Sequence, residues 1–215
     1  MFLRPLLAVL MLSAVAAADP PKKVLLVASP ADNHPFGTHE YKAGMELLAE
    51  LLNRQPGVSA AVEVAEGPWK DGPDLIGRAD AVVLFLTEGA KWASADEARS
   101  TAFRKLAARG GGFACLHWGM GTRDAEPVAA FVDLFGGCHG GPDRKYKVVT
   151  DAAVSVAAPS HPAVVGIKDF AVGKEEFYYA LKLPKAGTHT PLLKAVIEGA
   201  PETVAWAWER PGGGR

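Results

Sequence analysis

The chain has 215 residues, 49% of them hydrophobic, which is enough for one domain with a sizeable core. Lys and Arg number 23 against 24 Asp and Glu, so the formal net charge is −1. Proteins that bind nucleic acid or anionic membranes through charge carry a basic excess, which this chain lacks. The composition favours a small molecule or a protein as the partner, and it indicates no oligomeric state.

Residues 1–18 have the pattern of a secretory signal peptide. Arg4 precedes an apolar run at residues 6–15, and three alanines at 16–18 form a small-residue cleavage site. The run is shorter than the ~20 residues that span a bilayer, and no later segment is long enough. We therefore expect an exported protein, periplasmic or extracellular, with a mature domain of residues 19–215 and no membrane association after cleavage. Without Arg4 the balance is 22 basic against 24 acidic residues, a charge of −2.

The first half of the mature chain alternates strand and helix patterns. Short apolar runs predict strands, and apolar residues at helical spacing predict helices that begin near Thr38 and Ser94. The expected strands are residues 22–29, 60–65, 81–86 and 111–116, and the expected helices are 38–53, 94–108 and 125–135. This alternation predicts an α/β fold with a doubly wound, mainly parallel sheet of the flavodoxin-like kind.

The second half consists of short strand-like runs separated by Pro and Gly. These runs predict antiparallel additions to the edge of the sheet. They cover residues 145–150, 153–157, 177–183, 192–197 and 204–208. The last residues, 210–215, have turn chemistry with no strand after it, so we expect a domain that is truncated at its C-terminus.

Candidate site residues follow three of the expected strands. In a parallel sheet, ligands bind beyond the carboxyl ends of the strands, where loops from distant parts of the sequence meet. The loop after the first strand also contains Asp32. We expect convergence at this edge for His34, His39 and Glu40 of the first loop, Glu88 after the third strand, and His117 after the fourth.

His117 is the strongest single candidate. The segment Cys115-x-His117-x-Gly119 has the frame of a nucleophile elbow, in which flanking small residues let a strand bend sharply and expose one side chain. Here the exposed position is a histidine. Cys115 fits poorly as a nucleophile, because the positions two residues away on either side are Phe113 and His117.

The convergent histidines allow two kinds of chemistry. His34, His39 and His117 could bind zinc or another divalent metal, because imidazole is a common ligand of such ions. Alternatively, His117 and His39 could act as general acid and base, with Glu40 or Glu88 as the second carboxylate. A structural alternative also stays open, in which the histidines face solvent or bond backbone groups.

Several other residues have ordinary structural interpretations. His139 follows a helix, so we expect it at the opposite edge of the sheet, and His161 before a proline indicates a turn. Glu175-Glu176 indicates a solvated loop, with a polar contribution to a pocket as the alternative. Trp206 and Trp208 share one face of a strand, which is typical of core residues. Cys115 and Cys138 could pair after export, although an inert buried thiol is the commoner state.

The order of these motifs resembles the ThuA-like (trehalose-utilisation) domain family, and above all its exported members. The residues that carry the resemblance are His39-Glu40-Tyr41-Lys42-Ala43-Gly44, Gly110 to His117, Ser160-His161-Pro162, Glu175-Glu176-Phe177-Tyr178 and Val204 to Glu209. The resemblance implies a scaffold like that of class I glutamine amidotransferases. The elbow cysteine of that scaffold falls at His117, so glutaminase activity should be absent.

The resemblance also implies a role in carbohydrate use, including the handling of oxidised disaccharides. The family's His-Glu loop maps to His39 and Glu40, and its strand-end histidine maps to His117. Family members usually continue past Arg215 with a further strand and helix. We therefore expect a domain that acts on a small-molecule carbohydrate. The alternatives are a non-catalytic carbohydrate- or protein-binding module and, less well supported, a thiol enzyme that uses Cys115.

Overall fold

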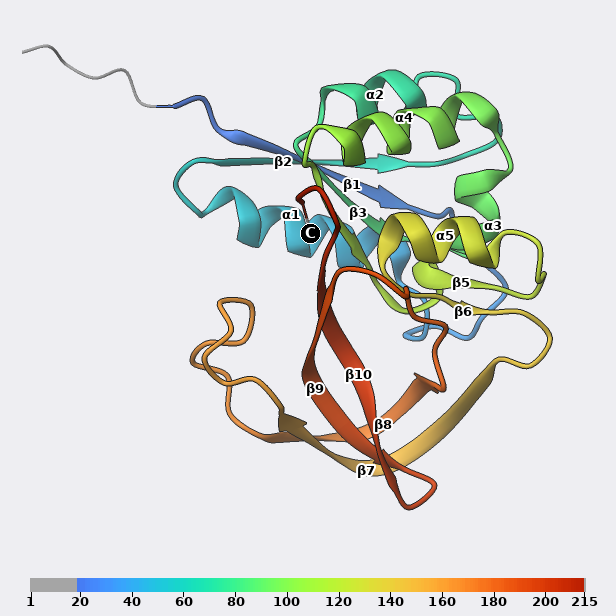
Figure 1. Ribbon diagram of the computed structural model, residues 1–215, viewed down its shortest axis with the longest axis vertical. Helices are drawn as coiled ribbons and strands as arrows, with labels where there is room; N and C mark the ends of the chain where they lie inside the picture. The colour runs from blue at the N-terminus through green and yellow to red at the C-terminus, as the bar shows by residue number, and fades with distance from the viewer. Residues whose placement is uncertain (1–18, 215) are drawn as a thin grey trace, which may run out of the picture.

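The computed structural model describes residues 19–214, so the signal-peptide pattern at 1–18 and Arg215 lie outside the described residues. Figure 1 shows the arrangement of the elements. In chain order they are β1 (Lys22–Ala28), α1 (Tyr41–Asn53), β2 (Val58–Val64), α2 (Gly72–Arg78), β3 (Ala81–Phe85), α3 (Gly89–Ser94), α4 (Glu97–Ala108), β4 (Gly112–Cys115), the 3-10 helix η1 (His117–Met120), β5 (Gly121–Thr122), α5 (Val128–Phe135), β6 (His139–Gly140), β7 (Lys145–Val156), β8 (Phe170–Tyr179), β9 (Thr188–Ile197) and β10 (Ala200–Glu209).

The first half of the molecule is a four-stranded parallel sheet with the order β2-β1-β3-β4. In the centre of the sheet, Val24 of β1 pairs with Ala60 of β2 on one side and with Ala81 of β3 on the other. Helix α1 covers one face, and α2 and α4 cover the other (Figure 1). The predicted doubly wound, flavodoxin-like arrangement is therefore confirmed.

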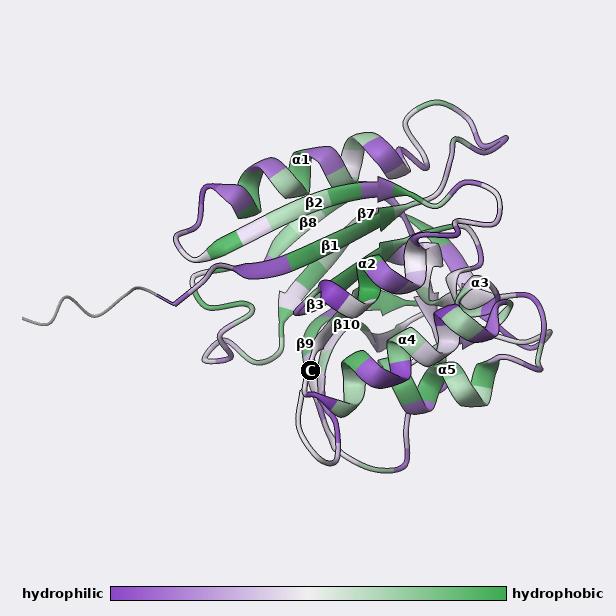
Figure 2. Cartoon of the chain, turned by 90° about the horizontal axis from the view of Figure 1, so that it is seen from above, coloured by the Kyte–Doolittle hydropathy of each residue, from purple (hydrophilic) through white to green (hydrophobic). Residues whose placement is uncertain are grey.

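Burial on both faces explains why the central strands are continuous apolar runs. Leu25 and Val27 of β1 pack into the core on the α2 and α4 side, while Leu26 and Ala28 pack against α1. Successive strand residues point to opposite faces, so a strand covered on both sides needs an apolar residue at every position. Figure 2 shows this as hydrophobic colour along β1 and β3, between the helices.

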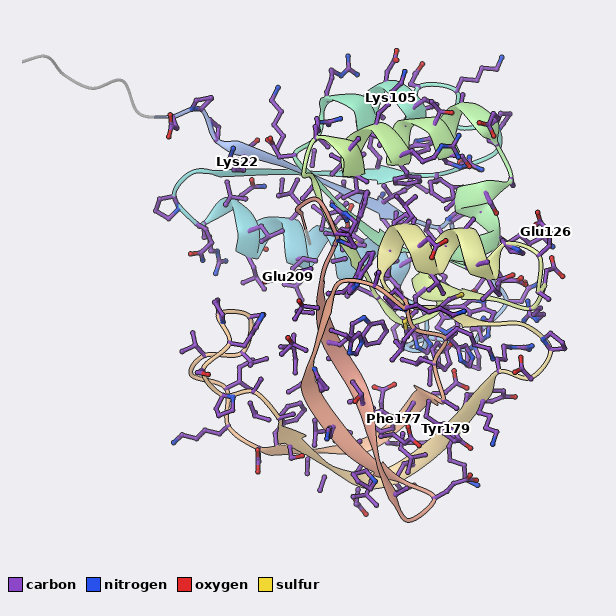
Figure 3. The ribbon with its side chains drawn as sticks, in the orientation of Figure 1. Lys22, Lys105, Glu126, Phe177, Tyr179 and Glu209 are labelled. Atoms are coloured by element: carbon purple, nitrogen blue, oxygen red, sulfur yellow. The ribbon has the colours of Figure 1, made fainter. Side chains whose placement is uncertain are left out.

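The second half forms its own antiparallel sheet with the order β10-β9-β7-β8. Figure 1 shows these strands below the parallel layer, and Figure 3 marks Phe177 and Tyr179 on β8. The antiparallel character is as predicted, but the strands do not extend the edge of the parallel sheet. They have a separate core of Ala152, Val154, Phe177, Ala195 and Ile197. A sheet can bury one face in this way without pairing to its neighbour.

Two strands that were expected to be separate in this half form one continuous strand. Residues 145–150 and 153–156 belong to the single strand β7, which pairs with β8 from Lys145 to Val154. Asp151 lies between them with φ +52°, a left-handed conformation within the strand. The polar residue and its backbone geometry produce the interruption in the apolar pattern, but the pairing continues past it.

Three helices each begin three residues later than expected, and one of them, α5, begins at Val128 rather than at residue 125. Helix α1 begins at Tyr41, and the Thr38 hydroxyl bonds instead to the carbonyl of Pro35 in the preceding turn. Ser94 ends α3, where its hydroxyl donates to the carbonyl of Ala90 at 3.0 Å. The cap of α4 is Asp96, whose carboxylate accepts from the backbone N–H of Arg99 at 2.7 Å. A hydroxyl can bond either to an earlier carbonyl or to a later N–H, and here the earlier carbonyl is preferred.

The short elements α2, α3, β5 and β6 were not predicted. Helix α2 has only seven residues and contains Gly72, Pro73 and Gly77, which give it little intrinsic helix propensity. Its formation depends on packing, since Ile76 is fully buried in the core beneath it. Among residues 19–214, no helix has the length and apolar character required to cross a membrane.

Candidate functional site

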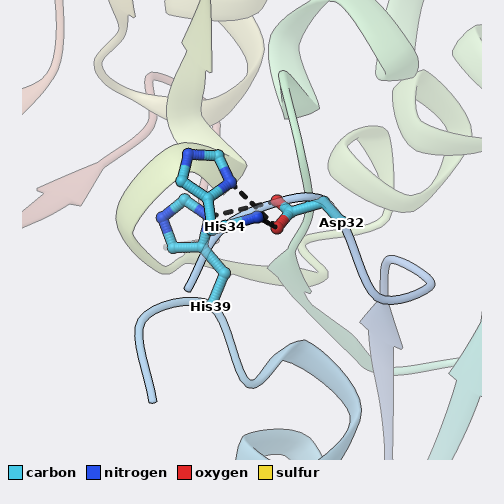
Figure 4. A group of neighbouring side chains, drawn as sticks. All are labelled: Asp32, His34 and His39. Atoms are coloured by element: carbon cyan, nitrogen blue, oxygen red, sulfur yellow. Dashed lines mark hydrogen bonds and ion pairs between the residues drawn. The ribbon is translucent and has the colours of Figure 1, made fainter. Parts of the chain in front are cut away.

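The loop after β1 folds around the carboxylate of Asp32. The Nδ1 atom of His34 lies 2.8 Å from one carboxylate oxygen, and the Nδ1 atom of His39 lies 3.1 Å from the other (Figure 4). The hydroxyl of Tyr41, in the first turn of α1, donates to the same carboxylate at 2.9 Å. Thr87, after β3, donates to the Tyr41 hydroxyl at 3.0 Å. The loop is thus held by polar bonds that connect the ends of two parallel strands.

His117 occupies the bend directly after β4. Its φ of +47° is left-handed, a conformation that non-glycine residues adopt at a cost of about 1–3 kcal/mol and mostly at functional positions. Gly119 makes the bend possible, because a Cβ atom there would lie 2.5 Å from the carbonyl oxygen of Leu84. The sharp turn predicted at His117 is therefore confirmed.

The two loops bring the Nε2 edges of their histidine rings together. The Nε2 atoms of His39 and His117 are 3.1 Å apart, although the residues are 78 positions apart in the sequence. The His39 side chain is 8% exposed and that of His117 is 23% exposed. The pair is therefore largely shielded from water but open on the His117 side.

The antiparallel sheet adds two side chains to this pair. Tyr178 of β8 stacks on the His117 ring at a centroid distance of 4.6 Å, and its hydroxyl lies 3.3 Å from the Nε2 atom of His117. A carboxylate oxygen of Glu176 lies 3.7 Å from the same nitrogen. Glu175-Glu176 therefore lies in a strand rather than the expected solvated loop, and Glu176 reaches the site.

His139 also joins the site, contrary to the expectation that it would lie at the far edge of the sheet. Its ring stacks on the opposite face of Tyr178 at 3.9 Å, so the three rings form a column with Tyr178 in the middle. Two features bring the chain back to the site after α5. Gly136 takes the left-handed conformation that ends the helix, and β6 then pairs in parallel with β5, matching His139 with Gly121.

Hydrogen bonding and burial fix the protonation of the central groups. Burial tends to raise the pKa of Asp32, but hydrogen bonds from the His34 backbone and from the side chains of His39, Tyr41 and His34 outweigh it and hold that pKa well below its usual range. Asp32 is therefore ionised, and the Nδ1 atom of His39 must donate to it. Burial, with the charges of His39 and His34, lowers the pKa of His117 to about 4. His117 is thus neutral near pH 7.

The two glutamates expected at the edge make other contacts. Glu88, itself left-handed at φ +48°, pairs with Arg123 and accepts from the Arg123 backbone N–H at 3.1 Å. Glu40 is exposed, and its carboxylate accepts from the backbone N–H of Gly37 at 2.9 Å. Neither carboxylate has a hydrogen bond or ion pair with a histidine of the pair among the described contacts.

The two cysteines are both free thiols. Burial, with a smaller contribution from Cys138, raises the pKa of Cys115 far above its usual range. Burial also raises the pKa of Cys138 to about 12. A thiol that stays protonated is a poor nucleophile, so the geometry does not favour a thiol enzyme.

A cleft of about 860 Å³ opens beside His117, between β4 and the antiparallel sheet. Glu176 and Tyr178 line it together with His117, and its other walls are mainly apolar. The volume lies within the range of about 300–1,000 Å³ that is typical of small-molecule sites. His161 also lines the cleft, but its Nδ1 atom accepts from the backbone N–H of Ala163 at 3.2 Å within its own turn.

The donor atoms around His117 are compatible with a divalent metal. Two imidazole nitrogens that bind one zinc ion at ~2.0–2.1 Å in tetrahedral geometry are about 3.3 Å apart, close to the 3.1 Å between His39 and His117. Asp32 bonds the other nitrogen of His39, as an outer carboxylate does in many zinc sites. A second group, Asp32, His34 and His39, has ligand atoms within 4.8 Å of one another (Figure 4), but those atoms are already hydrogen bonded.

Several members of this site were not singled out as site residues from the sequence, although Tyr41 and Tyr178 lie within the motifs that carry the family resemblance. Only the packing of separate elements brings the hydroxyls of Tyr41 and Tyr178 to the histidines, and that of Thr87 to Tyr41. Asp32 was noted in the loop, and its spacing from His34 matches the short turn that its carboxylate closes with the His34 backbone N–H.

Comparison with known proteins agrees with this architecture. The sequence pattern of the ThuA family, described as trehalose utilisation, matches residues 23–215. Among curated proteins, none matches the sequence. A solved structure of a ThuA-like protein from Bacteroides uniformis is similar in fold, with a TM-score of 0.63 and 16% identity. The similarity covers 91% of this chain and 81% of that one. At this identity the likeness supports the fold alone.

Proposed function

This chain belongs to the ThuA family of trehalose utilisation, and from that premise we propose that it acts on a sugar or sugar derivative, with His39 and His117 as the reacting pair. The observation that carries the proposal is the 3.1 Å separation of their Nε2 atoms beside an open cleft. Carbohydrate reactions move protons on and off hydroxyl groups, and a neutral imidazole near pH 7 can take or give such a proton.

The geometry supports a different role for each residue of the pair. Ionised Asp32 accepts the Nδ1 proton of His39, which leaves the Nε2 lone pair of His39 directed at His117. His117 is the more exposed of the two and lines the cleft, so its ring meets the substrate. A proton taken up by this pair can be shared between the two Nε2 atoms, and the Asp32 carboxylate stabilises the resulting charge.

The same residues support a metal-assisted version of this function. His39 and His117 would hold a divalent ion such as zinc, with His34 as the third ligand expected from the sequence and Glu176 as a carboxylate within reach of His117. Such an ion would lower the pKa of a bound water or polarise a sugar oxygen. The proposal includes no glutaminase activity, because a histidine occupies the apex of the elbow and the neighbouring Cys115 thiol is held protonated by burial.

The pattern of residues 1–18 supports export, and we include a periplasmic or extracellular location in the proposal. The partner that we propose is a small-molecule carbohydrate.

The test is turnover of disaccharides and oxidised disaccharides by the chain from residue 19 onward, followed as release of reducing sugar. The variants His117→Gln and His39→Gln should each lose about 10²–10⁴-fold in rate. The matched control is His189→Gln, because His189 lies on β9 and its ring stacks on Trp206 rather than on another histidine. Sugar binding without turnover in the unaltered protein would instead support a non-catalytic binding module.

Metal content distinguishes the metal-assisted version of the function from acid–base chemistry by the histidines alone. Elemental analysis of the purified protein should be compared with that of His117→Ala and His39→Ala. Near-stoichiometric metal that both substitutions abolish would establish the metal-assisted version. Folded, metal-free protein that still turns over its substrate would leave acid–base chemistry by the histidine pair.

A further inference from the structure

The cleft beside the histidine pair changes in polarity along its length. Its polar end holds His117, Glu176 and the hydroxyl of Tyr178. Away from these residues the walls are apolar, with Phe113 of β4 on one side and Val172, Leu193, Val204 and Trp206 of the antiparallel sheet on the other. Phe170 and Leu116, which also line the cleft, are exposed at 42% and 39%.

Most polar side chains in the apolar part of the cleft have a hydrogen-bond partner within the protein. The indole N–H groups of Trp206 and Trp208 donate to the carbonyls of Gly136 and Ala186, at 3.0 and 2.9 Å. Glu175 accepts from the backbone N–H of Glu176 at 2.9 Å, and His161 is bonded within its own turn. Beyond the second oxygen of Glu175 and the Nε2 atom of His161, the side chains of this part of the cleft therefore offer rings and aliphatic groups.

A second sugar would be a poor occupant of these walls. Sugars carry hydroxyl groups on most carbons, and each hydroxyl that is buried without a partner costs roughly 1–3 kcal/mol. An aromatic or alkyl group instead gains about 25 cal/mol for each Å² of apolar surface removed from water. The volume of about 860 Å³ leaves room for such a group beyond a single sugar ring.

We propose that the substrate is a glycoside with an apolar non-sugar part, in which the sugar lies against His117, with His39 behind it, and the apolar part fills the cleft between β4 and the antiparallel sheet. This inference rests on the proposed function, since it takes the histidine pair as the sugar end. It deepens that function by naming the substrate class and by assigning the antiparallel sheet to substrate selection.

The test compares four probes by calorimetric titration of the chain from residue 19 onward. They are phenyl glucoside, methyl glucoside of the same anomer, trehalose and phenol. Burial of a phenyl ring should make phenyl glucoside bind about tenfold more tightly than methyl glucoside, with a more negative heat-capacity change. Trehalose, whose second sugar brings unpaired hydroxyls to the apolar walls, should bind no better than methyl glucoside.

Two variants test whether the preference for phenyl over methyl glucoside depends on the cleft. Phe170→Ala removes a ring that lines the cleft but lies outside the buried clusters, so it should lower the preference for phenyl over methyl glucoside about threefold. Tyr146→Ala is the matched control. Tyr146 is an exposed aromatic residue on β7 of the same sheet and does not line the cleft, so the preference should stay unchanged.

The outcomes separate this inference from the proposed function. Equal binding of phenyl and methyl glucosides, or tightest binding of trehalose, would overturn the apolar substrate class; dependence of that binding on His117 would leave the proposed function standing. Phenol binding as tightly as phenyl glucoside would show an apolar pocket with no sugar end, which contradicts both. The absence of binding by any probe at millimolar concentration would overturn the apolar substrate class, and the turnover assay with disaccharides and oxidised disaccharides would then decide the proposed function.

Discussion

The parallel and antiparallel sheets of this protein are built on different principles. The parallel sheet is covered by helices on both faces, and residues such as Leu26 and Leu84 are completely buried. The antiparallel sheet has a small core of its own, and Leu193 and Val204 on its cleft side remain only partly buried. The first sheet positions the histidines, and the second supplies Tyr178, Glu176 and the apolar walls. The closed core and the open cleft wall are thus separated into two layers.

Removal of matched leucine side chains should give the largest contrast between the sheets. Leu84→Ala on β3 should lower the free energy of unfolding by about 3 kcal/mol, because it creates a cavity in a closed core. Leu193→Ala on β9 should cost about 1 kcal/mol, because its side chain already borders the open cleft. Urea unfolding of both variants measures the difference. Equal losses would contradict the contrast between a closed core and an open wall.

Added methyl groups should give a slightly smaller contrast. Gly119→Ala should destabilise the fold by about 2 kcal/mol, because its Cβ atom would meet the carbonyl oxygen of Leu84 at 2.5 Å and the elbow would have to shift. Gly173→Ala on β8 has no atom within 4 Å of the added carbon, so its effect should stay within about 1 kcal/mol. Thermal unfolding compares the two. A tolerated Gly119→Ala would show that the elbow is not held against β3.

Acid should weaken the junction between the two layers. Burial, followed by the charges of Arg144 and Lys182, lowers the pKa of His139 to about 4 from its ordinary 6.5. Between these values the unfolded chain binds a proton at His139 that the folded chain does not, so stability is present above pH 6.5 and is lost as the pH falls toward 4. The expected loss from this group is on the order of 2 kcal/mol.

A variant isolates that contribution from those of other groups. Unfolding should be followed at a series of pH values for the unaltered protein, for His139→Gln and for His161→Gln. His139→Gln should flatten the acid limb, whereas His161→Gln, on an outer turn, should leave it as it is. An acid limb that is identical in all three proteins would exclude His139 as the source.

Much of the parallel layer could be predicted because its signals are local. The apolar run of β1 and the helical spacing of α1 each lie within one short segment, and the bend at His117 follows from the small residues around it. Helix ends were less predictable, since Thr38 and Ser94 each had a carbonyl and an N–H within reach. The short helix α2 depends on burial of Ile76, which no local pattern reveals.

Less of the site could be predicted, because its contacts depend on tertiary placement. The loop after β3 ends near the histidines, but Glu88 turns to Arg123, and Thr87 joins the polar cluster instead. Glu176 and Tyr178 reach His117 only because the antiparallel sheet lies below the elbow. No spacing within one segment encodes such an approach.

By itself, the sequence determined the alternation of strands and helices, the order of the motifs that place the chain in its family, and the histidine at the apex of the elbow. Each of these depends on residues that are neighbours in the chain. Only the tertiary structure decided that His139 returns to the site, that Tyr178 lies between two imidazoles, and that an apolar cleft adjoins His117. These features depend on how strands from separate segments pair and pack. The left-handed conformation of Gly136, for example, ends α5 and directs the following segment back toward the site.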